Sequence, residues 1–195
     1  MPTNDKNRLV RQVRSCGAEF RARDEGGPVI EGYFSVFNRD YELWPGAVEQ
    51  VAPGAFRETL GGDIRALANH DTRLVLGRTT TGTLTLREDD KGLVGTIKMN
   101  EQDSDAMNLY ARVQRGDVSQ CSFGFDILDE EFTERSDGSV LWTIRKVKLY
   151  EVSVVTFPAY VETAVSARKA EVDTIRRRRL DAWKNEMKER MKKWH

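Results

Sequence analysis

Short stretches in which hydrophobic and polar residues alternate recur along the chain, which predicts a protein built mainly from β-strands. Residues 20–37 contain a Gly26-Gly27 link, and residues 84–99 contain a turn at residues 89–92. Each segment is predicted to form a β-hairpin, because glycine-containing links between strand-like runs are typical hairpin signals. Further strands are predicted at residues 64–69, 121–127, 140–147 and 149–157.

Helical segments are fewer than strands. Pro53 and Gly61 bracket a short helix predicted over residues 53–60, since proline suits a first helical turn and glycine the position past the end. Ser104 is predicted to cap a second helix, which ends at Gly116 and carries an apolar stripe. That stripe consists of Ala106, Met107, Leu109, Tyr110 and Val113.

The strands are joined mostly by hairpins and loops, including a loop predicted through residues 44–46. This pattern predicts an α+β fold, mostly β, in which an antiparallel or mixed sheet of about seven strands closes into a barrel with helices packed outside. No internal repeat is visible, so one domain is predicted at residues 18–167. A flexible N-terminal arm, residues 1–17, precedes it, and a C-terminal tail, residues 168–195, follows it.

The C-terminal tail is basic, whereas the rest of the chain is acidic. Residues 168–195 hold eleven Lys or Arg and five Asp or Glu, a balance of +6, which leaves −6 on residues 1–167 of a chain with no net charge. An apolar stripe predicts an amphipathic helix, which we expect to bind the protein's own body, a second copy in a homo-oligomer, or an assembly protein. The run Arg176–Arg179 is a weak signal for nucleic acid, and a solvated helix face is the preferred interpretation. The stripe consists of Leu180, Trp183, Met187, Met191 and Trp194.

Length and composition exclude several classes of protein. The 195-residue chain can bury one substantial core, and it has no apolar run long enough to span a membrane. It opens without a charged segment followed by an apolar one, so no secretory signal is expected. Its two cysteines are far apart in sequence, which favours a reducing cytoplasm over a disulfide framework. With two histidines and these cysteines, neither a metal nor another cofactor is expected.

Candidate chemistry comes from one serine, one histidine and one carboxylate. Ser119 and Ser122 compete as nucleophile, and alternation favours Ser122, which lies opposite an apolar face of its strand. His70 is the one histidine outside the extreme C-terminus, and Glu151 opens a strand-like run. A hydroxyl, a base and an orienting acid are the minimum set for acyl transfer. The apolar face consists of Cys121, Phe123, Phe125 and Ile127.

The candidates have alternative interpretations. Asp71, next to the histidine, is a rival for the orienting acid, although neighbouring side chains on an extended segment point to opposite sides. Glu151 could equally be a surface carboxylate paired with Lys146 or Lys148. A Cys121 thiol is chemically able to act as a nucleophile, but its place on the core face predicts a buried, inert side chain.

Five distinctive segments occur in order: residues 32–37, 51–56, 68–71 with Leu76-Gly77 after it, 121–125 and 149–160. Together they resemble the prohead (capsid maturation) serine protease family of tailed bacteriophages. The resemblance covers residues 20–166, and the shared order and separation of the segments make it specific. This family is related in fold to the herpesvirus assemblin proteases, so the resemblance implies an assemblin-like barrel.

The resemblance also implies a function. It implies that His70 is the general base, Ser122 the nucleophile and Glu151 the third member of a triad. It implies a serine endopeptidase that cleaves scaffolding and coat-protein segments, and itself, inside the prohead in the host cytoplasm. The major capsid protein and its scaffolding domain are then the expected partners, and backbone amides near residues 155–157, or in a turn after Ser122, the expected oxyanion hole. A non-catalytic assembly module that binds coat subunits is the competing hypothesis.

Overall fold

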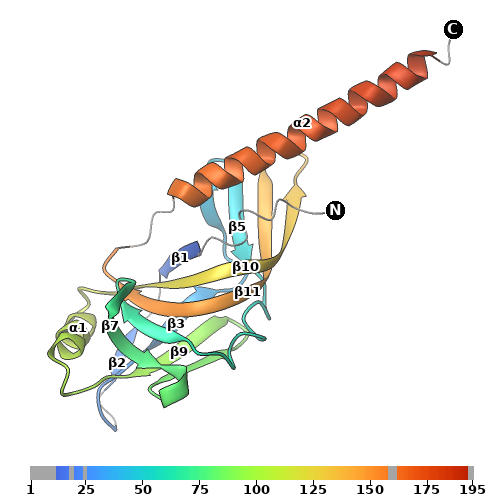
Figure 1. Ribbon diagram of the computed structural model, residues 1–195. Coiled ribbons are helices and arrows are strands. Elements are labelled where there is room, and N and C mark those ends of the chain that lie inside the picture. Colours follow the sequence, from blue (N-terminus) through green and yellow to red (C-terminus); the bar gives the residue numbers. More distant parts are fainter. Residues whose placement is uncertain (1–11, 18–19, 24–25, 158–161, 193–195) are drawn as a thin grey trace. The chain divides into compact units, whose positions relative to one another are not determined.

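The computed structural model describes residues 12–17, 20–23, 26–157 and 162–192 (Figure 1). The chain divides into two compact units, one ending at Tyr160 and the other starting at Val161. The first unit contains β1 (Gln12–Gly17), β2 (Arg21–Arg23), β3 (Val29–Val36), β4 (Tyr41–Trp44), β5 (Ala47–Val51), β6 (Arg65–Ala68), β7 (Asp71–Arg78), the short 3₁₀ helix η1 (Thr79–Thr81), β8 (Leu84–Glu88), β9 (Gly92–Lys98), α1 (Ser104–Arg115), β10 (Gln120–Glu134) and β11 (Val140–Val155). The second unit contains α2 (Glu162–Lys192).

The long β10–β11 hairpin organises the larger of two sheets, which has seven strands (Figure 1). One edge of β11 pairs with β10 over almost its whole length. Its other edge pairs in parallel first with β5, at residues 140–144, and then with β6, at residues 151–154. On the far side of β10, β1 pairs antiparallel with residues 120–125. The sheet therefore brings β1, β10, β11 and β6 together over residues 120–125 and 151–154.

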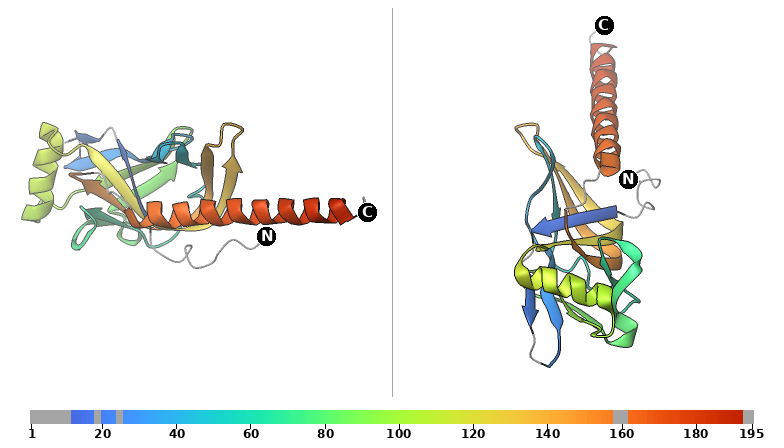
Figure 2. Two further views of the ribbon diagram at one scale, coloured as in Figure 1. Left: turned by 90° about the horizontal axis from the view of Figure 1, so that it is seen from above. Right: turned by 90° about the vertical axis from the view of Figure 1, so that its left-hand side faces the viewer.

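The second sheet has four strands in the order β2-β3-β9-β8, all antiparallel. Both predicted hairpins, around residues 26–27 and 89–92, are part of it and are confirmed. α1 packs against β2, β3 and β7 at one end of the unit (Figure 2). It buries the predicted stripe through Ala106, Leu109, Tyr110 and Val113.

Aromatic side chains from both sheets and the intervening turns fill the core. Phe123 stacks on Phe125 with ring centroids 4.7 Å apart, and Phe56 meets Phe123 edge to face at 5.4 Å. Phe34 of β3 is also fully buried in this cluster. The apolar face predicted for β10 is therefore confirmed, with Cys121, Phe123, Phe125 and Ile127 all in the core.

Several predictions about the elements are wrong. The strands form two sheets rather than one closed barrel, and the described residues contain eleven strands rather than about seven. Residues 53–60 form successive turns instead of a helix, because Gly54 has a left-handed φ of 88° that interrupts helical geometry. Residues 140–155 form one strand with an irregularity near Tyr150, not two strands.

Two predicted connections also differ in detail. The expected loop at residues 44–46 is the tight turn of the β4–β5 hairpin, in which Pro45 precedes Gly46 with a φ of 82°. Proline followed by a glycine of positive φ is the signature of a type II turn. The N-cap of α1 is Asp103, whose carboxylate accepts hydrogen bonds from the N–H groups of Asp105 and Ala106, rather than Ser104.

Near both ends of the chain, the observed elements do not start and end at the predicted boundaries of the arm and the tail. Residues 12–17 of the predicted arm form β1, and residues 1–11 lie outside the described part. α2 starts at Glu162, before the predicted tail boundary at residue 168, and Trp194 of the predicted stripe is not among the described residues. The other stripe residues are exposed: Leu180, Trp183, Met187 and Met191.

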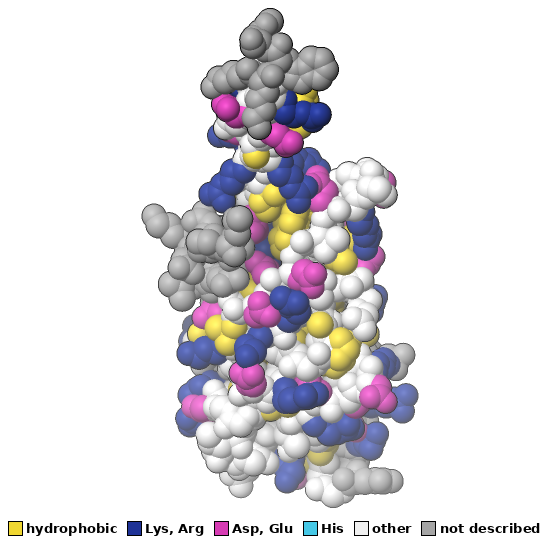
Figure 3. Space-filling view, turned by 90° about the vertical axis from the view of Figure 1, so that its right-hand side faces the viewer, with side chains coloured by type: hydrophobic (Ala, Val, Ile, Leu, Met, Phe, Trp, Pro, Cys, Tyr) yellow, Lys and Arg dark blue, Asp and Glu magenta, His cyan; other side chains and the backbone are white. Residues whose placement is uncertain are grey.

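On the face drawn in Figure 3, Lys and Arg side chains are interspersed with Asp and Glu, as is typical of a solvated surface. Within the described ranges, no helix is both long and apolar enough to cross a bilayer.

Candidate active site

His70 lies in the tight turn that joins β6 to β7. Ala68 pairs with Asp71, so Asn69 and His70 alone form this turn. Their φ angles are 50° and 62°, the pattern of a type I′ turn, whose twist suits a two-residue hairpin. Asparagine and histidine are both enriched among non-glycine residues with this left-handed conformation, which is still uncommon and depends on support from the surroundings.

That support comes from the C-terminal end of β11. The Asn69 N–H donates to the carbonyl of Val154 at 2.9 Å, and the Asn69 Oδ1 accepts from the N–H of Thr156 at 2.8 Å. Parallel pairing of β6 with β11 brings the turn to this position. Asn69 therefore fixes the turn that carries the histidine by donating one hydrogen bond and accepting another.

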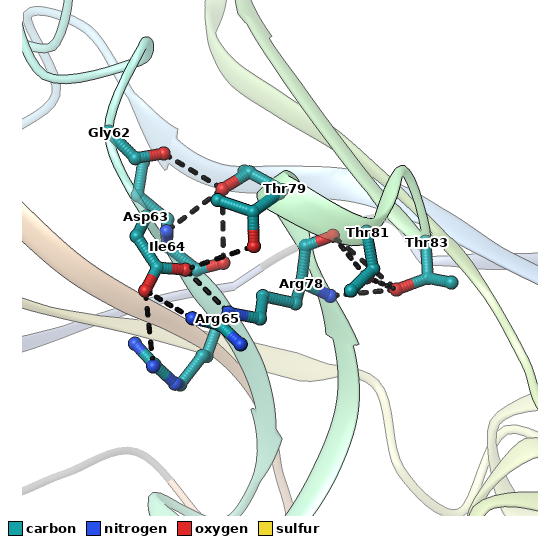
Figure 4. Close-up of polar contacts among 9 residues, drawn as sticks. Gly62, Asp63, Ile64, Arg65, Arg78, Thr79, Thr81 and Thr83 are labelled. Carbon is teal, nitrogen blue, oxygen red and sulfur yellow. Dashed lines mark hydrogen bonds and ion pairs between the residues drawn. The ribbon is translucent and has the colours of Figure 1, made fainter.

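A polar cluster clamps the other end of the same hairpin (Figure 4). The Arg78 Nε and Nη2 each donate to the Asp63 carboxylate at 2.6 Å, and the Arg65 Nη2 lies 3.2 Å from it. The Thr79 N–H donates to the Ile64 carbonyl at 3.0 Å, and the Thr79 hydroxyl accepts from the Ile64 N–H at 2.9 Å. Hydrogen bonds from Arg78 hold the pKa of Asp63 at about 2. The hairpin is thus secured at both its base and its tip.

The His70 ring contacts two polar side chains of β11. Its Nδ1 lies 2.7 Å from the Glu151 Oε1 and 3.3 Å from the Ser153 Oγ, and this hydroxyl donates to the Glu151 Oε2 at 2.6 Å. When the carboxylate is ionised it only accepts hydrogen bonds, so Nδ1 is then the donor and Nε2 of a neutral ring is an acceptor. Within the described part of the chain, this buried Nε2 has no hydrogen-bond partner.

Ser122 of β10 lies directly opposite Ser153 of β11, and both residues are fully buried. Residues opposite each other on antiparallel strands share a face, with Cβ atoms about 4.5–5.5 Å apart. Ser122 therefore lies on the same face as Ser153, whose hydroxyl contacts His70 and Glu151. The Ser122 hydroxyl, however, donates to the carbonyl of Arg14 on β1, at 2.9 Å, and not to the histidine.

Arg14 is itself held by a buried ion pair that the sequence pattern did not reveal. Its Nε and Nη2 donate to both carboxylate oxygens of Glu49, the Nη2 contact at 2.9 Å, and its guanidinium lies 5.7 Å from the Phe125 ring centroid. Arg14 is 4% exposed and Glu49 is 0% exposed. Glu49 belongs to β5, which pairs with a neighbour on each side, so β1 is anchored to the interior of the sheet.

The alternative candidates have other partners. The Asp71 carboxylate binds the Arg73 guanidinium and N–H, which lower the pKa of Asp71 to about 2. Lys146 pairs with Glu58 at 2.7 Å, and the Lys148 ammonium lies 5.2 Å from the Tyr150 ring centroid.

The other candidate groups named from the sequence differ in solvent exposure and in their place in the fold. Cys121 is buried in the core and donates to the Tyr33 carbonyl, and Ser119 is an exposed residue preceding β10. The N–H of Thr156, one of the amides expected to bind an oxyanion, donates to Asn69 in this arrangement. The turn expected after Ser122 is absent, because β10 continues to Glu134. Among the described residues, no three His, Cys, Asp or Glu side chains are arranged to hold a metal ion.

Comparison with known protein families matches residues 17–178 to the caudovirus prohead serine protease model. The chain belongs to this family. It is 32% identical over 157 residues to the prohead protease of Enterobacteria phage HK97, a match that covers 76% of this chain and 64% of that protein. It is 29% identical over 104 residues to the prohead protease of Escherichia phage T5, which covers 53% of this chain and 45% of that protein. No solved structure matches the chain significantly.

The chain therefore spans less than two thirds of the length of these curated relatives. The range matched to the prohead serine protease family contains His70, Ser122 and Glu151. It begins at Gly17, the last residue of β1. The strand that covers Ser122 thus lies almost entirely outside the matched range.

Proposed function

We propose that this chain is a serine endopeptidase in which Ser122 is the nucleophile, His70 the general base and Glu151 the residue that orients the base. Glu151 fixes the hydrogen on Nδ1 and thereby leaves Nε2 to remove the Ser122 proton. The Ser122 oxygen then attacks the scissile carbonyl carbon, and His70 returns the proton to the leaving amine. A second cycle with water releases the acyl group and restores the serine.

The observation that carries this proposal is the His70–Glu151 contact of 2.7 Å beside a serine pair in a protein of a serine protease family. Glu151 is 1% exposed, and an unpaired carboxylate buried this deeply would be strongly destabilising. Its two oxygens accept from His70 and Ser153, an arrangement suited to stabilising an imidazolium during catalysis.

We further propose that the substrates are proteins of the immature capsid. The two curated relatives are named prohead proteases, which supports action inside the prohead, in the host cytoplasm. Coat-protein segments that serve as scaffold are the proposed substrates, and the protease itself is a second one. The major capsid protein is then both the partner that recruits the enzyme and the protein that the enzyme cleaves.

Coexpression with the coat protein of the same phage tests this function. The chain is expected to shorten the coat protein, and Ser122→Ala is expected to bind it without cleaving it. Ser119→Ala is the matched control, because Ser119 lies three positions away and is exposed. Binding with no cleavage by the wild-type chain would instead support the non-catalytic assembly module, and cleavage by Ser122→Ala would exclude Ser122 as the nucleophile.

A further inference from the structure

Ser122 is inaccessible in this structure. A scissile carbonyl carbon has to approach the serine oxygen to about 3–3.5 Å before attack. The Ser122 residue is 0% exposed, so no polypeptide can reach it without a movement of the protein. Within the sheet, Ser122 is flanked by β1 on one side and by β11 on the other.

Strand β1 is the neighbour that covers it from the sheet edge. β1 pairs with residues 120–125, and Ser15 lies opposite Ser122. The Arg14 carbonyl accepts the Ser122 hydrogen bond at 2.9 Å. This bond directs the serine hydrogen toward a backbone oxygen of β1, whereas attack requires the same hydrogen to face the base. The Nε2 of His70 has no hydrogen-bond partner among the described residues, as expected when the Ser122 hydroxyl donates to Arg14 instead of to the base.

Granting the proposed function, we propose that β1 closes the active site by occupying the edge of β10 beside Ser122, and that the site opens when an extended segment of a substrate protein replaces β1. Removal of β1 frees the backbone donors and acceptors along residues 120–125. An extended peptide satisfies such an edge by adding a strand, which gives affinity through main-chain hydrogen bonds. The same exchange brings a foreign carbonyl beside the Ser122 hydroxyl.

The buried Arg14–Glu49 ion pair holds β1 in place. Glu49 remains in the interior of the sheet when β1 leaves, whereas Arg14 moves with β1 and regains water. Glu49→Gln should therefore release β1 selectively: the glutamine is neutral and similar in shape, while Arg14 is left as a buried, unpaired cation. Arg14→Ala is less informative, because it removes the guanidinium from the buried Glu49 carboxylate and so also alters the interior of the sheet.

The experiment measures how fast a fluorophosphonate labels Ser122 in the full chain, by intact mass and peptide mapping. Such a reagent is attacked by an activated serine oxygen and loses fluoride, so it reports access and activation without a protein substrate. Glu49→Gln is expected to raise the labelling rate at least about tenfold, the change that corresponds to 1.4 kcal/mol in the opening equilibrium. Glu58→Gln is the control, because it removes the Glu58–Lys146 pair, which is exposed.

A second experiment cross-links β1 to β10 instead of releasing it. Cys16 lies opposite Cys121 in the β1–β10 register, and directly opposite residues have Cα separations that a disulfide can span. Diamide accepts two electrons and two protons from the thiols and becomes a hydrazine as the S–S bond forms. The locked protein is expected to label at least about tenfold more slowly and to recover after reduction, whereas Cys16→Ser should not respond to the oxidant.

The outcomes separate the two proposals. Equal labelling of wild type and Glu49→Gln, with hydrogen exchange showing residues 120–125 exposed in the variant, would overturn closure by β1 and leave the proposed function standing. Unchanged labelling after the disulfide has formed would do the same. Absence of Ser122 labelling in a variant whose β10 edge is exposed would overturn the proposed function, and the closure proposal with it.

Discussion

Ser122 and Ser153 lie directly opposite each other on β10 and β11, yet it is Ser153 whose hydroxyl contacts the His70–Glu151 pair. The Ser153 hydrogen is donated to Glu151, on the Nδ1 side of the imidazole. A hydroxyl on that side cannot give its proton to Nε2. This geometry suits a positioning role for Ser153 and supports the proposal that Ser122 is the nucleophile.

Substitution of the two serines tests this division of roles. Ser122→Ala should abolish turnover, a loss of roughly 10⁴-fold or more, because the covalent step disappears. Ser153→Ala should lower kcat by about 10- to 100-fold, since one hydrogen bond to a charged carboxylate is lost, and should leave KM nearly unchanged. The measurement is steady-state cleavage of coat protein. Ser153→Ala should still be labelled by a fluorophosphonate at Ser122, and labelling at residue 153 in Ser122→Ala would reverse the assignment.

Replacement of the carboxylate tests the third member of the triad. Glu151→Gln keeps the side-chain shape but can donate to Nδ1, which places the histidine hydrogen on Nε2 and removes the base. Cleavage is expected to fall by about 10³- to 10⁴-fold. Asp71→Asn is the matched control, because the Asp71 carboxylate binds Arg73 instead of His70, and its activity should equal that of wild type. The opposite ranking of these two variants would make Asp71 the orienting acid.

The site shows which parts of the structure a local pattern can predict. Alternation along residues 121–127 correctly predicts which side chains of β10 enter the core, because that choice is made within one strand. Alternation also predicts that Glu151 and Ser153 share a face, and the structure has their side chains in contact. Contact with His70 depends on parallel pairing between β6 and β11, whose paired residues are 86 positions apart in the sequence, and no local pattern reports such a pairing.

Other features depend on similarly distant partners. The polar N-terminal segment is predicted to be a flexible arm, yet residues 12–17 form β1, which pairs with β10 and whose Arg14 forms an ion pair with the buried Glu49. The predicted barrel fails for a related reason. Hairpin signals report which strands are neighbours in sequence, but closure depends on which edges meet, and here the strands divide into two sheets.

Asn69 should control both the stability of the turn and the position of His70. Asn69→Gly keeps a residue that tolerates positive φ but loses the hydrogen bond to Thr156, at a cost of about 1 kcal/mol in the free energy of unfolding. Asn69→Ala loses the same bond and adds about 1–2 kcal/mol of left-handed strain. Denaturant unfolding measures both values. Cleavage should be reduced in both variants, and equal stability of Gly and Ala at this position would show that the turn relaxes.

The exposed stripe on α2 should act in recruitment rather than catalysis. Leu180, Trp183 and Met187 are exposed on one helix of the second unit, an arrangement suited to binding a protein surface. Trp183→Glu combined with Met187→Glu is expected to reduce incorporation into proheads while leaving fluorophosphonate labelling of Ser122 unchanged. Incorporation is measured by the amount of the protein in purified proheads. Asp181→Glu is the control on the same helix, and undiminished incorporation of the double variant would remove this role.

Asp63 should give the stability of the first unit a distinct acid dependence. Its folded pKa of about 2 lies below the ordinary value of 3.8, chiefly because Arg78 donates hydrogen bonds to the carboxylate. A lowered pKa means that this stabilisation is complete above the unfolded pKa and is lost as the pH falls from about 4 through about 2. The effect is small, because both side chains are about 40% exposed and screened by water. Asp63→Asn should therefore lower Tm at pH 7, and the difference from wild type should shrink as the pH falls to 2. A difference in Tm that stays constant over this range would show that the Asp63–Arg78 pair does not support the hairpin through its charge.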